Sequence, residues 1–205
     1  MSRLLRAALA PAMEERSDGR AVKETEFVFY ARIVNMEELQ QAQSVESHEQ
    51  WEIQAPKTER NAVSGRLRIR KTDKGDSGNP EFVLTTKTKT ADGHSIEVSV
   101  PTTHANFVQF QYLSESGMIK DRYVFEIEGS ECVWEVDVFK KPDGSYYEWC
   151  KIDLEFDAPL EKLPAFPIEL ADVITNQDGQ RTDEEETRVR TLYDYEFITK
   201  NRFIA

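Results

Sequence analysis

The sequence predicts an α+β protein dominated by antiparallel β-strands, with helices flanking the sheet. Two strand-like segments, Cys132–Phe139 and Tyr147–Phe156, surround the turn sequence Pro142-Asp143-Gly144, which suits a three-residue hairpin loop with glycine in the left-handed position. Polar and apolar residues alternate along both segments, as expected for strands whose two faces differ. The same alternation recurs in Glu24–Ile33 and Gly65–Arg70.

The hairpin sorts charge onto one face. If Lys141 pairs with Ser145, Asp137 opposes Trp149. Alternation then collects the charged residues on one side: Glu135, Asp137, Lys151, Asp153 and Glu155. The apolar residues lie on the other side: Trp134, Val136, Val138, Ile152, Leu154 and Phe156. An ordinary half-buried strand also turns polar residues outward, so a solvated outer face is one interpretation of this hairpin.

Two further turns give registers that bring opposite charges together. The two-residue loop Gly129-Ser130 places Arg122 opposite Asp137, and a glycine-containing turn after Lys87 places Lys87 opposite Glu97. Opposite charges paired across strands stabilise a sheet by roughly 0.2–1 kcal/mol per pair. Because independent turns agree, the pattern favours a barrel with a polar interior, whose apolar outer side is covered by helices.

The chain has 205 residues, enough for one large domain. We expect an N-terminal arm over residues 1–23 and a single domain over residues 24–205 that includes C-terminal helices. Helices are expected where good helix formers or capping residues occur: Met36–Glu49, Pro101–Glu115, Ile168–Ile174 and Thr182–Phe197. Phe107, Phe110 and Leu113 fit one face of the second helix, and Gly117 is placed to stop it.

Charge and cysteine content exclude several function classes. The net charge of −12 makes broad nucleic-acid binding an unlikely function, and no apolar run is long enough to span a membrane, so no membrane partner is expected. In the predicted hairpin Cys132 and Cys150 lie four residues out of step, too far apart for a disulfide. Two free thiols predict a reducing compartment, with the cytoplasm as the default.

The order of elements resembles the CYTH superfamily, the triphosphate tunnel metalloenzymes, over about Glu24 to Asp157. The segments that carry the resemblance are Leu67-Arg68-Ile69-Arg70, the helix–Gly–strand stretch Phe107–Arg122, and Trp134–Glu155. The resemblance implies an eight-stranded antiparallel tunnel barrel, open at both ends. Basic residues inside such a tunnel hold a triphosphate, and acidic residues hold Mg²⁺ or Mn²⁺.

The resemblance also implies roles for individual residues. The implied substrate-binding residues are Arg66, Arg68, Arg70, Lys87, Lys120 and Arg122. The implied metal ligands are Glu24, Glu26, Asp137, Asp153 and Glu155. The implied catalytic residues are Glu24, Glu26, Lys87 and Arg122. These residue types suit the chemistry, because arginine forks bind phosphate and hard cations prefer carboxylate oxygens. The chain departs from the family at Val28, where the family's N-terminal motif has a lysine.

Two function classes follow. The first is a metal-dependent hydrolase of inorganic triphosphate or a nucleoside triphosphate. The second is a CYTH-like binding or regulatory protein without turnover, acting through polyphosphate or nucleotide binding or through an acidic protein-interaction surface. Val28 favours the second class, whereas the acids and arginines that match the family's motifs favour the first.

Overall fold

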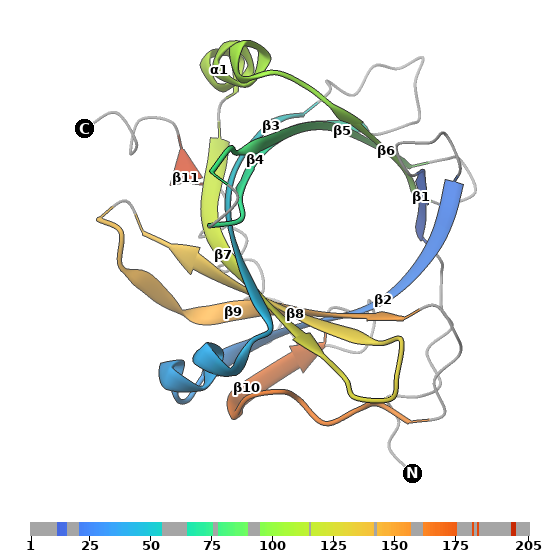
Figure 1. Cartoon of the computed structure of the whole chain (residues 1–205), viewed down its shortest axis with the longest axis vertical. Helices are drawn as coiled ribbons and strands as arrows, with labels where there is room; N and C mark the ends of the chain where they lie inside the picture. Colours follow the sequence, from blue (N-terminus) through green and yellow to red (C-terminus); the bar gives the residue numbers. More distant parts are fainter. Residues whose placement is uncertain are drawn as a thin grey trace. The chain divides into compact units, whose positions relative to one another are not determined.

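The computed structural model describes residues 12–15, 21–54, 65–75, 78–89, 95–114, 116–141, 143–156 and 162–175, together with 182, 184 and 198–199. The chain divides into two compact units. The first unit contains the described residues of Thr25–Val45 and Asp121–Tyr195. The second contains those of Pro11–Glu24, Glu46–Lys120 and Glu196–Ala205. Three strands contribute residues to both units: β2 (Ala21–Ile33), β3 (Ser44–Gln54) and β7 (Ser116–Glu126) (Figure 1). Each unit is described by itself.

The first unit is built around the hairpin predicted from the sequence. Its strands are hydrogen-bonded in the order β7-β8-β9-β2-β10. Their bounds are Ser116–Glu126 for β7, Val133–Lys140 for β8, Tyr146–Phe156 for β9, Ala21–Ile33 for β2 and Leu170–Thr175 for β10. The pairings β8–β9, β9–β2 and β2–β10 are all antiparallel.

The second unit is a sheet covered by one helix. Its strands follow the order β3-β4-β5-β6-β1, where β1 is parallel to β6 and antiparallel to the beginning of β2. The bounds are Ser44–Gln54 for β3, Gly65–Asp73 for β4, Glu81–Lys89 for β5, Ser95–Pro101 for β6 and Ala12–Glu15 for β1. The short strand β11, Ile198–Thr199, pairs with the start of β7. Helix α1, His104–Leu113, lies beside β3 and β4 (Figure 1).

The prediction of a β-dominated, mainly antiparallel protein is confirmed, but the closed barrel of eight strands is wrong. The described residues form eleven strands, and β1, β10 and β11 lie outside the eight that the sequence predicted. The segment Ile168–Ile174 was expected to be helical and instead leads into β10. A register shift between Ala171 and Ile174, with Asp172 at φ 53°, interrupts the alternation that identifies a strand. The division into an arm and a single domain stays a prediction.

Two helix predictions need correction. Of the predicted Met36–Glu49 helix, Met36–Gln41 forms a short 3₁₀ segment capped by the Asn35 side chain, and the residues from Ser44 onward belong to β3. Pairing with β4 outweighs the helix propensity of that stretch. Helix α1 is confirmed, with Thr103 as its N-cap, but it ends at Ser114. The predicted Thr182–Phe197 helix lies outside the described residues apart from Thr182 and Glu184.

Gly117 does not stop α1, because it lies within β7. A Cβ atom at this position would lie 2.6 Å from Trp51 Cε3 and 2.8 Å from the Gln50 carbonyl oxygen. Glycine is therefore required here by the close approach of β7 to β3. Leu113 was expected on the same face of α1 as Phe107 and Phe110, but it is 71% exposed.

Each unit has an apolar core on one face of its sheet. In the first unit the core contains the apolar residues of the hairpin and the matching residues of β2: Phe29, Ala31, Ile33, Trp134, Val136, Val138, Ile152, Leu154 and Phe156. In the second unit Phe107 and Phe110 of α1 pack on Trp51 and Ile69. The alternation predicted from the sequence is confirmed: Glu135, Asp137, Lys151 and Asp153 lie opposite the first core, and Arg66, Arg68 and Arg70 lie opposite Ile69.

The hairpin register is confirmed at the turn and shifted further along. The Lys141 N–H donates to the Ser145 carbonyl oxygen at 2.7 Å, as predicted. A bulge then shifts the pairing by two residues, so that Asp137 opposes Lys151 rather than Trp149. A shift of two residues preserves which face each side chain occupies. The face assignment therefore survives although the predicted partners were wrong.

Candidate functional site

The charged face of the first unit is organised by Arg122 of β7. Its Nε and Nη2 donate to the two carboxylate oxygens of Asp137 at 2.8 and 2.9 Å, and its Nη1 forms an ion pair with Glu135. The predicted pairing of Arg122 with Asp137 is confirmed. Burial acts to lower the pKa of Arg122, but the carboxylates of Asp137, Glu135 and Asp153 outweigh burial and hold that pKa well above its ordinary value.

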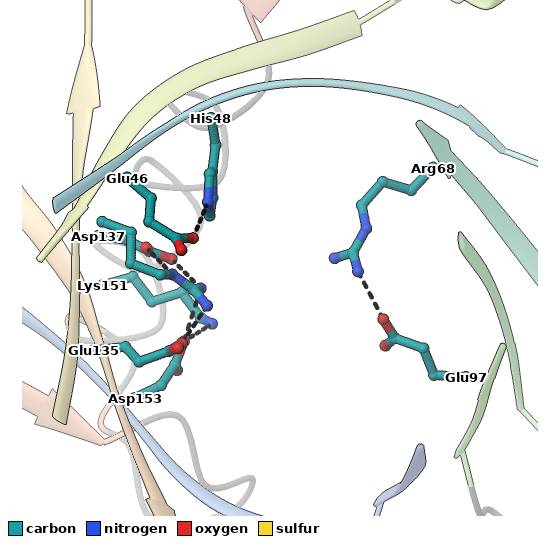
Figure 2. A network of polar contacts seen from close by, with 9 residues as sticks. Glu46, His48, Arg68, Glu97, Glu135, Asp137, Lys151 and Asp153 are labelled. Carbon is teal, nitrogen blue, oxygen red and sulfur yellow. Dashed lines mark hydrogen bonds and ion pairs between the residues drawn. The ribbon is translucent and has the colours of Figure 1, made fainter. Parts of the chain in front are cut away.

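Asp153 of β9 lies at the edge of this cluster. Lys151 Nζ donates to Asp153 Oδ2 at 2.5 Å, and Arg122 Nη2 lies 4.0 Å from the same oxygen. Figure 2 shows the side chains of Lys151 and Asp153 pointing toward one another. The other oxygen, Asp153 Oδ1, is buried and has no hydrogen-bond partner in the described part of the chain. We call Arg122, Glu135, Asp137, Lys151 and Asp153 the Arg122 cluster.

The Arg122 cluster does not fit a divalent cation as it stands. Both oxygens of Asp137 accept from Arg122, and Asp153 Oδ2 accepts from Lys151. Within the described residues, no group of three or more His, Cys, Asp or Glu residues is placed to hold a metal ion. Glu26 opposes Glu155 across β2 and β9. The side chains of Glu24 and Glu26 lie outside the described part, so the predicted metal site stays a prediction.

Val28 of β2 lies opposite a residue of the Arg122 cluster in the first unit. It opposes Asp153 across β2 and β9, and it packs against the cluster of Tyr30 and Ile174. A valine side chain donates no hydrogen bond. The charged face of the first unit therefore has an apolar side chain opposite Asp153, whose Oδ1 has no hydrogen-bond partner among the residues that the structure describes.

The second unit carries the predicted arginines. Arg66, Arg68 and Arg70 occupy alternate positions of β4 and therefore share one face, as predicted. The register places Arg66 opposite Lys87 of β5, whose side chain lies outside the described part. Lys87 also opposes Glu97 of β6, which confirms the predicted register of that hairpin. Elsewhere in this unit, Lys120 of β7 is buried.

Arg68 and Glu97 form an ion pair on this face. Arg68 Nη2 lies 2.6 Å from Glu97 Oε1, and the side chains are 21% and 13% exposed (Figure 2). Arg68 Nε is buried and has no hydrogen-bond partner among the described residues. Arg66 is more loosely held, because its Nη1 lies 3.8 Å from Glu52 Oε2 and its side chain is 52% exposed. We call Arg66, Arg68 and Arg70 the arginine face.

Two polar clusters were not found from the sequence. His48, within the stretch expected to be helical, is 1% exposed, and its Nε2 lies 3.0 Å from Glu46 Oε2. In the first unit the buried Asp121 accepts a hydrogen bond from Lys140 Nζ at 2.7 Å and another from the Tyr146 hydroxyl. The hairpin turn was a signal for the second cluster, because pairing Lys141 with Ser145 also sets Lys140 opposite Tyr146.

Comparisons with known proteins add little to this picture. No family model matches the chain, and no curated protein matches it. A solved structure, the PH1819 protein from Pyrococcus horikoshii OT3, is similar with a TM-score of 0.42 and 15% identity, covering 84% of this chain and 93% of that one. The CYTH resemblance is not confirmed by these comparisons. No helix in the described ranges is long and apolar enough to cross a membrane.

Proposed function

We propose that the second unit binds a polyphosphate anion, either inorganic triphosphate or the triphosphate group of a nucleotide, on the arginine face. The observation that carries this proposal is the placement of Arg66, Arg68 and Arg70 at alternate positions on one face of β4. A guanidinium has five N–H donors in a fork that matches phosphate oxygens. Arg68 uses one of its terminal nitrogens for Glu97, and Arg66 lies beyond hydrogen-bond distance of Glu52.

The spacing of the arginines favours a chain of phosphates over a single one. Alternate residues of a strand are roughly 6.6 Å apart along its axis. A linear polyphosphate can therefore contact two or three guanidinium groups at once, whereas orthophosphate contacts fewer. Each charge-assisted hydrogen bond adds to affinity, so the longer anion gains more from the same face.

The geometry supports binding without turnover more than hydrolysis. In the first unit the carboxylates of Asp137 and Asp153 are already paired with Arg122 and Lys151. Val28 lies at the position where the CYTH superfamily, which this chain resembles, has a lysine. Metal-dependent hydrolysis with Mg²⁺ or Mn²⁺ remains the alternative, and it requires Glu24 and Glu26 to complete a metal site. The two free buried thiols agree with a reducing compartment such as the cytoplasm.

The test is isothermal calorimetry with tripolyphosphate, ATP and orthophosphate on the wild type and two variants. Arg68→Ala should weaken tripolyphosphate binding by about 1.5–3 kcal/mol, the range for a hydrogen bond to a charged group. Lys71→Ala is the matched control, because it removes a positive charge from the same strand on the opposite face. The proposal is wrong if the wild type does not bind, or if both variants lose affinity equally.

Phosphate release is measured beside binding, with tripolyphosphate and ATP in the presence of Mg²⁺ or Mn²⁺. Binding without release supports a binding protein. Release that Glu26→Gln abolishes, while leaving tripolyphosphate binding intact, would favour the hydrolase. An absence of both binding and release would direct attention to the acidic surface as the site of a protein partner.

A further inference from the structure

The contact between Arg68 and Glu97 spans an intervening strand. Arg68 lies on β4 and Glu97 on β6, and β5 lies between them. The β5 residue directly opposite Arg68 is Thr85, which also opposes Ser99 of β6. The hydroxyl groups of Thr85 and Ser99 are 2.9 Å apart and hydrogen-bonded to each other. Because these side chains are short, they leave room for the longer side chains of Arg68 and Glu97 to meet above β5.

We infer that Glu97 is an internal competitor for the anion site, and that it sets the affinity of the arginine face by occupying Arg68. This inference rests on the proposed function. Glu97 presents a carboxylate, whose negatively charged oxygens accept hydrogen bonds from arginine as phosphate oxygens do. Its Oε1 is 2.6 Å from Arg68 Nη2, so it already holds a group that a polyphosphate would need.

The competition has two components. An incoming anion must share Arg68 with Glu97 or displace it, and it must also approach a partly buried negative charge. Both components oppose binding, and replacing the carboxylate by an amide of the same shape removes the negative charge and weakens the hold on Arg68. The amide oxygen of glutamine can still accept from Arg68, so Glu97→Gln retains the contact while it removes the charge.

The control must remove a negative charge from the same unit without touching Arg68. Glu81 of β5 is 60% exposed and lies 3.3 Å from Lys74. It opposes Thr72, which is four residues from Arg68 along β4 and hence roughly 13 Å away at ~3.3 Å per residue. This exceeds the Debye length of about 8 Å at physiological ionic strength, so Glu81→Gln should have little effect on an anion at Arg68.

The experiment is calorimetry of tripolyphosphate with the wild type, Glu97→Gln and Glu81→Gln at physiological ionic strength. We expect Glu97→Gln to bind on the order of tenfold more tightly than the wild type, equivalent to about 1.4 kcal/mol. We expect Glu81→Gln to match the wild type.

The contrary results separate the inference from the proposed function. If the wild type binds but Glu97→Gln binds equally or more weakly, Glu97 is no competitor, and the proposed function stands. If neither protein binds any polyphosphate, both statements are overturned.

A measurement on the unmodified protein covers the case in which Glu97→Gln fails to fold. The guanidinium Nε–H resonance of Arg68, identified by its loss in Arg68→Lys, should shift during titration of the wild type with tripolyphosphate. A resonance that does not move while tripolyphosphate binds would show that Arg68 stays with Glu97, and it would refute the inference.

Discussion

Replacing Asp137 with alanine removes the carboxylate on which the Arg122 cluster depends. Asp137 is fully buried and accepts two hydrogen bonds from Arg122. Breaking a buried ion pair by removing one partner typically costs about 3–5 kcal/mol, because the other charge stays buried without its partner. Glu135 and Asp153 remain close to Arg122 in this variant. We therefore expect a loss near the lower end, about 3 kcal/mol.

The assay is thermal and urea unfolding followed by tryptophan fluorescence. For a chain of this length, about 1 kcal/mol corresponds to roughly 2–4 °C in Tm, so a loss of about 3 kcal/mol predicts a decrease of roughly 6–12 °C. Glu148→Ala is the matched control, since Glu148 lies on β9 at an exposed position. Asp137→Asn should fall between the two, because an amide keeps one acceptor but turns its N–H donors toward Arg122.

Two results would refute this reasoning about the Arg122 cluster. A Tm of Asp137→Ala within about 2 °C of the wild type would mean that the cluster contributes no more than an exposed ion pair. A decrease equal to that of Glu148→Ala would mean that burial of Asp137 has no particular consequence. Either result would require another reason for the charge sorting along β8 and β9.

Three further perturbations test other parts of the two units. Gly117→Ala should destabilise the protein by about 1–3 kcal/mol, because the new Cβ overlaps Trp51, and an unchanged urea midpoint would contradict this close approach. Tyr146→Phe should cost about 1–3 kcal/mol in urea unfolding, since Asp121 loses a hydrogen-bond donor while buried. Burial raises the pKa of the Cys150 thiol, so the folded protein keeps this proton after an unfolded thiol, with a pKa of about 8.5, has lost it. The contribution of the protonated Cys150 thiol to the free energy of unfolding is complete below about pH 8.5 and is lost as pH rises above it. Cys150→Ser should therefore flatten the decline in the free energy of unfolding between about pH 8.5 and 10. An unchanged slope would contradict the raised pKa of Cys150.

The face that each side chain occupies could be predicted from the sequence, because side chains at successive positions of a strand point to opposite faces. Trp134 and Val136 are buried, and Asp137 lies on the opposite face with Arg122, as alternation required. The same parity argument placed Arg68 with its neighbouring arginines. Registers close to the turns also held, because a glycine-containing loop fixes the first pairs.

The sequence does not predict the β-bulge of the hairpin or which segments pair as strands. The bulge after Val138 leaves the alternation intact, so nothing in the pattern marks the two-residue shift that pairs Asp137 with Lys151. The stretch around His48 has good helix formers, and only its pairing with β4 makes it a strand. Propensity describes what a segment prefers alone, whereas a strand depends on the partner beside it.

For the candidate site, the sequence predicts which face a charged residue occupies but not which partner it has. Sorting by parity places Asp137 and Asp153 on one face and cannot distinguish a carboxylate that neutralises an arginine from one that awaits a ligand. The contacts make that distinction: both oxygens of Asp137 accept from Arg122, whereas Asp153 Oδ1 is buried with no partner among the described residues. Val28, directly across the sheet from Asp153, supplies no donor. Burying an unpaired carboxylate oxygen is costly, so an added hydrogen-bond donor at this oxygen would stabilise the described part of the first unit.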